Sequence, residues 1–130
     1  AGRAWLRPWA PGLLGLFSPA GACAVGQRAY HYKEAHPTRE IDTQTPPQDL
    51  RFSHITENYL VNPRRDPDCI LPLTQLRTLR DEGVIGSLAD RAITCMGGVY
   101  SQRRVREEIA PAALAACRRE DIDCALLVAM

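Results

Sequence analysis

The amino-acid sequence predicts an α/β protein built on an open, mostly parallel sheet. Three short apolar segments have the composition of buried strands: residues 13–17, 92–96 and 122–130. Two segments with helical spacing, residues 73–82 and 105–118, separate them. A strand, a helix and a second strand in this order form a βαβ unit, whose strands run parallel. The expected architecture is therefore of the Rossmann or flavodoxin-like type.

The length of 130 residues allows one domain with a core of its own. We assign residues 1–11 to an N-terminal tail and residues 12–130 to a partial α/β domain. A long polar insert, about residues 26–65, reads mostly as loop, with weak extended character at 39–43 and 51–55. A loop of that length is uncommon in a compact domain and usually functional where it occurs.

The N-terminal segment has the residue order of a secretory signal peptide, with two arginines ahead of an apolar run and a stretch of small residues. Pro8, Pro11 and Gly12 interrupt the helix that such a peptide needs, so we interpret the segment as a tail leading into the first strand. No stretch approaches the roughly 20 apolar residues of a membrane span. We expect a cytoplasmic protein without membrane association.

Charge and cysteine content argue against two further classes. The formal net charge is +1, and neighbouring acids dilute each pair of arginines, which predicts no nucleic-acid partner. The five cysteines are widely spaced and odd in number, without a pair at metal-ligand spacing. We expect reduced thiols and no metal site. Cys95, Cys117 and Cys124 lie in apolar stretches, where a free thiol usually serves packing.

The first helix has clear boundaries in the sequence. Pro72 suits the first helical position, Leu73, Leu76 and Leu79 recur at helical spacing, and Gly83 ends the pattern. The second helix places one apolar face along its length: Val105, Ile109, Ala113, Ala116 and Cys117. Pro111 should kink this second helix or start a new first turn within it. The last apolar segment suits a central parallel strand.

Ligands of open parallel sheets bind beyond the carboxyl ends of the strands, so the loops after Phe17, Met96 and Met130 should line one crevice. Gly97 and Gly98 follow the second strand, either as a tight turn that needs positive φ or as an approach to a bound anion. Three histidines, His31, His36 and His54, fall in the polar insert, and none has a second metal ligand at close helical or strand spacing.

Five segments occur in order along the chain: Ser53-His54, Asp68-Cys69-Ile70-Leu71-Pro72-Leu73, residues 76–89 (LRTLRDEGVIGSLA), Met96-Gly97-Gly98 and Asp123-Cys124-Ala125-Leu126-Leu127-Val128. Each segment is ordinary by itself. Their order and spacing resemble the selenoprotein B-type subunit of the glycine/sarcosine/betaine/D-proline reductase family. The resemblance runs from about Leu13 to the end of the chain.

The resemblance implies that a selenocysteine, or a cysteine in some members, follows the last strand as the reducing nucleophile. It would come just after Met130, so the catalytic residue is expected outside this chain, which holds no cofactor of its own. A UGA codon read as a stop, or a chosen boundary, would end the chain there. The resemblance also implies a partner subunit whose pyruvoyl-type carbonyl group holds the amine of a small amino-acid-like substrate.

The expected function is that of the N-terminal portion of a selenol- or thiol-dependent reductase subunit, which cleaves a C–N bond reductively and is inactive alone. The alternative is a non-catalytic α/β module that binds a partner or a small anion, or an inert truncated product. The candidates for the substrate pocket follow from the crevice and the resemblance together: Ser18, Gly21, Ser53, His54, Gly97 and Gly98.

Overall fold

The computed structural model describes residues 12–30, 38–53 and 60–128. Its main sheet has four strands in the order β3-β5-β1-β6. They are β1 (Leu13–Ser18), β3 (Arg39–Asp42), β5 (Ser87–Thr94) and β6 (Cys124–Leu127). β1 pairs in parallel with both β5 and β6, and β3 pairs antiparallel with β5. The prediction of three neighbouring parallel strands is confirmed.

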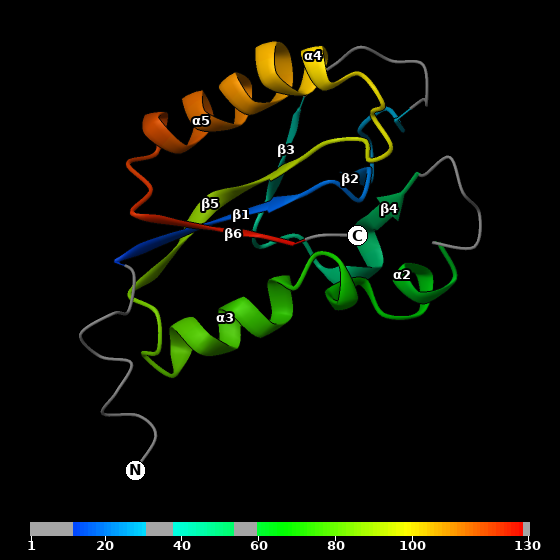
Figure 1. Cartoon of the computed structure of the whole chain (residues 1–130). Helices are drawn as coiled ribbons and strands as arrows, with labels where there is room; N and C mark the ends of the chain where they lie inside the picture. Colours follow the sequence, from blue (N-terminus) through cyan, green and yellow to red (C-terminus); the bar gives the residue numbers. More distant parts are fainter. Residues whose placement is uncertain (1–11, 31–37, 54–59, 129–130) are drawn as a thin grey trace.

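The helices cover the two faces of this sheet (Figure 1). α3 (Leu73–Asp81) lies on one face. A continuous helical segment lies on the other, made of α4 (Gln102–Arg104), a π-helical turn η4 (Val105–Ile109) and α5 (Ala110–Arg119). The α/β class with an open, mostly parallel sheet is therefore confirmed. Within the described sheet, β1 lies between β5 and β6, which is the strand order at the start of a flavodoxin-like fold.

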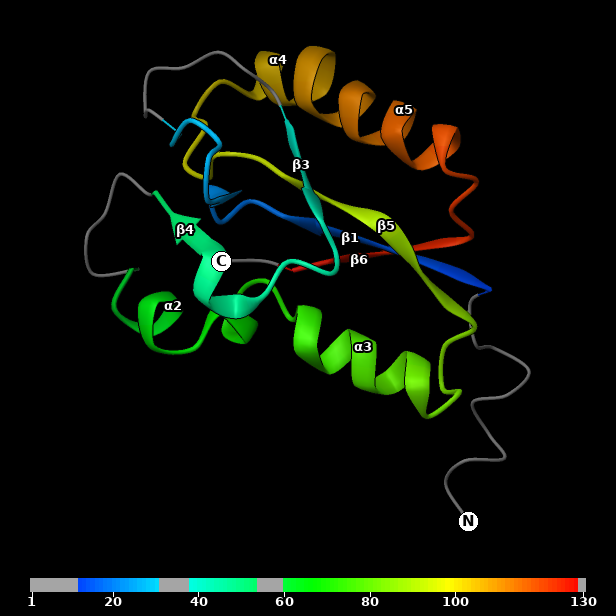
Figure 2. The ribbon, with the colours of Figure 1, turned by 180° about the vertical axis from the view of Figure 1, so that it is seen from behind.

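The polar insert has more structure than predicted. It contains β3, which lies at the near edge of the sheet in Figure 2, and β4 (Leu50–Phe52), which pairs antiparallel with β2 (Ala22–Ala24) just before the insert. β3 falls within the predicted extended segment 39–43, and β4 overlaps the start of the predicted segment 51–55. Two short helices lie in the described part of the insert, η1 (Pro47–Asp49) and α2 (Val61–Arg65), and a third, η3 (Pro67–Cys69), follows it.

β5 begins at Ser87, five residues before the predicted strand. The prediction missed its first half because the exposed Asp90 and Arg91 interrupt the apolar pattern. The pairing explains this interruption: Leu14 pairs with Leu88 and Leu16 with Ala92, so the register shifts between them and β5 bulges. The hydroxyl of Thr43 donates a hydrogen bond to the Ala89 carbonyl at 2.7 Å within that bulge.

The last apolar segment was predicted to be a central strand, and this was wrong for the described sheet. β6 lies at the edge and pairs with β1 alone among the described strands. Consequently Leu126 is 39% exposed and Leu127 is 70% exposed. The residues of β6 are apolar on both faces of the strand. This pattern indicates a preference for burial, but it does not indicate how many strands lie beside β6.

Both helices follow their sequence signals closely. α3 begins at Leu73, so Pro72 is its N-cap and not its first residue. The helix ends at Asp81, and Gly83, two residues later, has φ +70°. Pro111 lies in the first turn of α5, directly after the π-helical turn, where the Ala110 N–H donates to the Val105 carbonyl. A proline has no N–H and its ring crowds the carbonyl four residues earlier, which the wider turn accommodates. The prediction that Pro111 starts a new first turn is confirmed. Among the described residues, none of the helices combines the length and apolar character of a membrane span.

Candidate functional site

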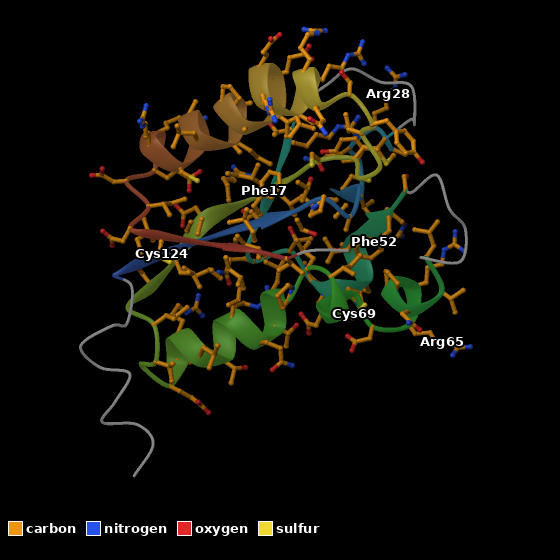
Figure 3. The ribbon with its side chains drawn as sticks, viewed as in Figure 1. Phe17, Arg28, Phe52, Arg65, Cys69 and Cys124 are labelled. Carbon is orange, nitrogen blue, oxygen red and sulfur yellow. The ribbon has the colours of Figure 1, made fainter. Side chains whose placement is uncertain are left out.

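The two faces of β1 differ in how completely they are packed. Side chains alternate along a strand, so Leu14 and Leu16 point toward α3. They are 7% and 1% exposed and belong to one core cluster with Leu71, Leu73 and Leu76. Phe17 points the other way, toward α5 (Figure 3). On that side the sheet and the helix leave an open groove.

The groove has a volume of about 470 Å³ and lies between the α4–η4–α5 segment and the sheet. It reaches from the carboxyl ends of β1 and β5 along β6. Its lining residues are Phe17, Pro19, Cys95, Met96, Gly97, Gly98, Val99, Val105, Ile109, Ala110, Ala113, Leu114, Cys117, Ala125 and Leu127. The ends of β1 and β6 are also the point at which the strand order reverses, the usual ligand position in open α/β sheets.

The chemistry of the groove is apolar. None of the described residues that line it is charged. Sulfur atoms of Cys95, Met96 and Cys117 add polarisable surface. Such a groove suits an apolar ligand or an apolar protein segment. Its described lining residues offer no charged side-chain partner for the ammonium or the carboxylate of a free amino acid.

Gly21 and Ser53, two of the predicted site residues, are joined through the backbone. The Gly21 N–H donates to the Cys95 carbonyl at 2.8 Å, and the Ser53 N–H donates to the Gly21 carbonyl at 3.1 Å. Gly21 has φ +61°, and a Cβ at this position would overlap the Ser53 carbonyl oxygen. Only glycine fits here without a backbone shift. Gly21 and Ser53 therefore lie next to Cys95, where the groove begins, and their contacts there are made by the backbone and not by side chains.

Ser18, a third predicted site residue, lies on the opposite side of the strand. It is fully buried, and its hydroxyl donates to the Ile70 carbonyl at 2.8 Å. A polar network lies beside it: the Tyr30 hydroxyl donates to the Thr94 carbonyl at 2.9 Å, and the Thr94 hydroxyl donates to the Ala22 carbonyl at 2.8 Å. The Thr94 hydroxyl joins β5 to β2, the Ser18 hydroxyl joins β1 to the segment before α3, and Ser18 does not line the groove.

Gly97 and Gly98 both line the groove, and Gly98 has φ +71°, as a tight turn after the strand requires. The structure thus brings Gly97 and Gly98 into the groove, places Gly21 and Ser53 next to it and separates Ser18 from it. His54, with the other two histidines, lies outside the described residues, as does Met130.

Three of the cysteines, Cys23, Cys69 and Cys95, show no sign of an activated thiol. Burial raises the pKa of Cys95 to about 11 and also raises the pKa of Cys23. At the exposed Cys69, desolvation and then the Asp66 carboxylate raise the pKa of the thiol. A reactive cysteine needs a lowered pKa. In the described part of the chain, no cluster of three or more His, Cys, Asp or Glu side chains is placed to hold a metal ion.

Sequence reasoning found part of the groove and missed the rest. The apolar helix face with Val105 and Ile109 was identified as such, and so were the two glycines. Phe17, Leu114 and Leu127 were missed. Phe17 carried a usable signal, because the period of two along β1 sets it opposite the packed Leu14 and Leu16. The exposure of Leu127 depends on strand order, which has no local signal.

The fold and the groove define a class: an open α/β protein with an apolar groove at the carboxyl ends of parallel strands, where ligands of such sheets usually bind. Within that class, the chain is similar to D-proline reductase subunit gamma of Acetoanaerobium sticklandii, with 30% identity over 115 residues. The match covers 88% of this chain and 47% of the relative, so the chain spans about half the relative's length. This similarity supports a relation to the reductase family and does not single out a selenoprotein B-type subunit. No family model matches the sequence, and no solved structure matches with significance.

Proposed function

We propose that this chain forms the sheet and groove of a reductase subunit that takes part in the reductive cleavage of a C–N bond in an amino-acid-like substrate. The observation that carries the proposal is the similarity to a D-proline reductase subunit over 88% of the chain. The parallel arrangement of β1, β5 and β6 supports it, because their carboxyl ends meet at one edge of the sheet, where substrates of open α/β proteins bind.

The nucleophile belongs directly after Met130 in this proposal, as a selenocysteine or a cysteine. A residue that follows β6 within a few positions lies near the carboxyl end of β1, since the two strands are parallel neighbours. The raised pKa values of Cys23, Cys69 and Cys95 support the placement of the nucleophile beyond these three thiols. The 130-residue chain is therefore proposed to be inactive alone.

The polar ends of the substrate would be held by groups outside the groove, because none of the described residues lining it is charged. A partner subunit fits this need, with a pyruvoyl-type carbonyl group that binds the substrate amine. The carbonyl would hold the leaving amine, and the groove would contribute an apolar wall that excludes water from the crevice. A dithiol would supply the two electrons that the cleavage consumes.

The test compares two versions of the protein with D-proline, glycine, sarcosine and betaine as substrates and a dithiol as electron donor. The 130-residue chain should show no turnover. A chain extended beyond Met130 through a further strand and helix, with cysteine or selenocysteine in the first position and the partner subunit present, should show turnover. Turnover by the 130-residue chain that Cys95→Ala abolishes would contradict the proposal and move the active centre inside the described fold.

The second candidate function is a non-catalytic binding module, and the charge-free groove favours it. A module of this kind would bind an apolar partner without chemistry. The two functions separate in the same assay. An extended chain that folds, binds its partner subunit and still turns over none of the four substrates would favour the binding module.

A further inference from the structure

The two edges of the described sheet differ in charge. β3, at one edge, carries Arg39, Glu40 and Asp42 among its four residues. β6, at the other edge, reads Cys-Ala-Leu-Leu and carries neither a charge nor a proline. Charged residues and prolines on an edge strand prevent pairing with other strands. The β3 edge is thus protected against added strands, whereas the β6 edge is not.

An apolar surface extends from the β6 edge to the helix above it. Leu127 on β6 is 70% exposed, and Leu114 on α5 is 49% exposed. Both line the same groove. Single exposed leucines are common on protein surfaces, but a strand edge and a helix face that share one apolar groove mark an interaction site. Edge and groove together are called the β6 surface below.

The chemistry of the β6 surface favours a protein segment over a small zwitterion. A free amino acid would leave its carboxylate and its ammonium without a charged partner among the described lining residues. A β-strand would instead pair its backbone with the edge of β6 that no described strand occupies, and place apolar side chains against Leu127. Because β6 is apolar on both faces, as strands inside parallel sheets are, a parallel strand fits it best.

The related reductase subunit contains enough polypeptide for such a segment. The 115 matched residues are 47% of D-proline reductase subunit gamma, so more than half of that protein lies outside the match. A parallel strand reaches its place in a sheet with a covering helix. The occupant that these observations support is therefore a strand-and-helix segment and not an isolated peptide.

We propose that the β6 surface docks a strand-and-helix segment of a reductase polypeptide, for which the unmatched part of D-proline reductase subunit gamma is long enough. Its strand pairs in parallel with β6, and its apolar side chains cover Leu127 and fill the groove toward Leu114. The identity of the partner rests on the proposed function. The docking geometry rests on the exposed edge and on the charge-free groove.

The probe for the test is the part of D-proline reductase subunit gamma outside the matched residues, produced as a separate polypeptide. Mixed with the 130-residue chain, it should form a complex of one to one stoichiometry, measured by light scattering after gel filtration and by titration calorimetry. Leu127→Glu, and separately Leu114→Glu, should weaken binding at least tenfold. Val61→Glu, which alters a 45% exposed valine on α2, is the matched control and should leave binding unchanged.

Circular dichroism should show native secondary structure for all three variants, since each changes an exposed side chain. Three outcomes would overturn the proposal: no complex with the probe, a complex that Leu127→Glu and Leu114→Glu leave intact, or dimers of the chain alone that Leu127→Glu dissolves. The last would identify a second copy of this chain as the occupant. None of these measurements uses turnover, so the docking proposal and the reductase proposal fail separately.

Discussion

The hydroxyl of Ser18 donates a hydrogen bond to the backbone carbonyl of Ile70 at 2.8 Å, and Ser18 is fully buried. This bond joins the end of β1 to the segment that leads into α3. It also explains why Ser18 does not line the groove, although it lies beside Phe17 in the chain. Successive residues of a strand point to opposite faces.

Ser18→Ala should destabilise the fold by about 1 to 3 kcal/mol, because it leaves the buried Ile70 carbonyl without this donor. The control is Ser87→Ala, which removes a similar bond from the Ser87 hydroxyl to the Gly12 carbonyl at an exposed position. Water can replace that bond, so the cost should stay below about 1 kcal/mol. Urea unfolding gives both values. An equal decrease in the free energy of unfolding for both variants would show that the burial of Ser18 does not matter.

Gly21→Ala should cost more than about 3 kcal/mol, since a Cβ would overlap the Ser53 carbonyl oxygen as well as strain a residue at φ +61°. Gly83→Ala is the matched control. Gly83 has φ +70° and no atom within 4 Å of an added Cβ. Gly83→Ala should therefore lower the free energy of unfolding only by the backbone strain, about 1 to 2 kcal/mol. The difference between the two variants in urea unfolding measures the contact with Ser53. No difference would mean that the backbone moves freely there.

Tyr30 should make the fold sensitive to alkaline pH. Desolvation by burial raises its pKa from 10 to about 12, so the fold favours the protonated phenol. Stability from this group is fully present below pH 10 and is lost as the pH rises through 12, by about 2 to 3 kcal/mol in total. Tyr30→Phe should remove the loss of stability at alkaline pH that the ionisation of Tyr30 causes.

The measurement for Tyr30 is the free energy of unfolding in urea at a series of pH values between 9 and 12, with each variant compared to the unaltered chain. Tyr100→Phe is the control, because Tyr100 is 90% exposed. It should keep the full pH dependence. A Tyr30→Phe profile that parallels the unaltered one would show that Tyr30 ionises in the folded protein without cost.

Local signals allowed the sequence to predict β1, α3 and the parallel arrangement. The apolar run at Leu13, the leucines of α3 and Gly83 each act within a few residues, and the βαβ order then limits the topology. The position of β6 at the edge could not be predicted, because strand order depends on contacts between distant segments. The apolar pattern of Leu126 and Leu127 would look the same in a central strand and in an edge strand.

The candidate site was predictable only in part for a similar reason. Gly97 and Gly98 were found because they directly follow a strand. The contact between Gly21 and Ser53 joins two loops far apart in the chain, and a glycine by itself does not reveal which carbonyl approaches it. The orientation of Ser18 was within reach, since period-two alternation from Leu14 and Leu16 sets it on the packed face.

The reactivity of the cysteine thiols tests whether any of them is an activated nucleophile. With a thiol-specific disulfide reagent at pH 8, the exposed Cys69 and Cys124 should react faster than the buried thiols. Cys23 and Cys95 should react only as fast as the fold opens, because both are buried and burial raises the pKa of each thiol. Urea should accelerate these two reactions and leave the fast ones nearly unchanged. Cys124→Ser should remove one fast equivalent, whereas Cys95→Ala, its matched control, should remove none. A fast reaction at Cys95 would mean that an activated thiol lies in the groove, and the nucleophile would then have to be sought within this chain.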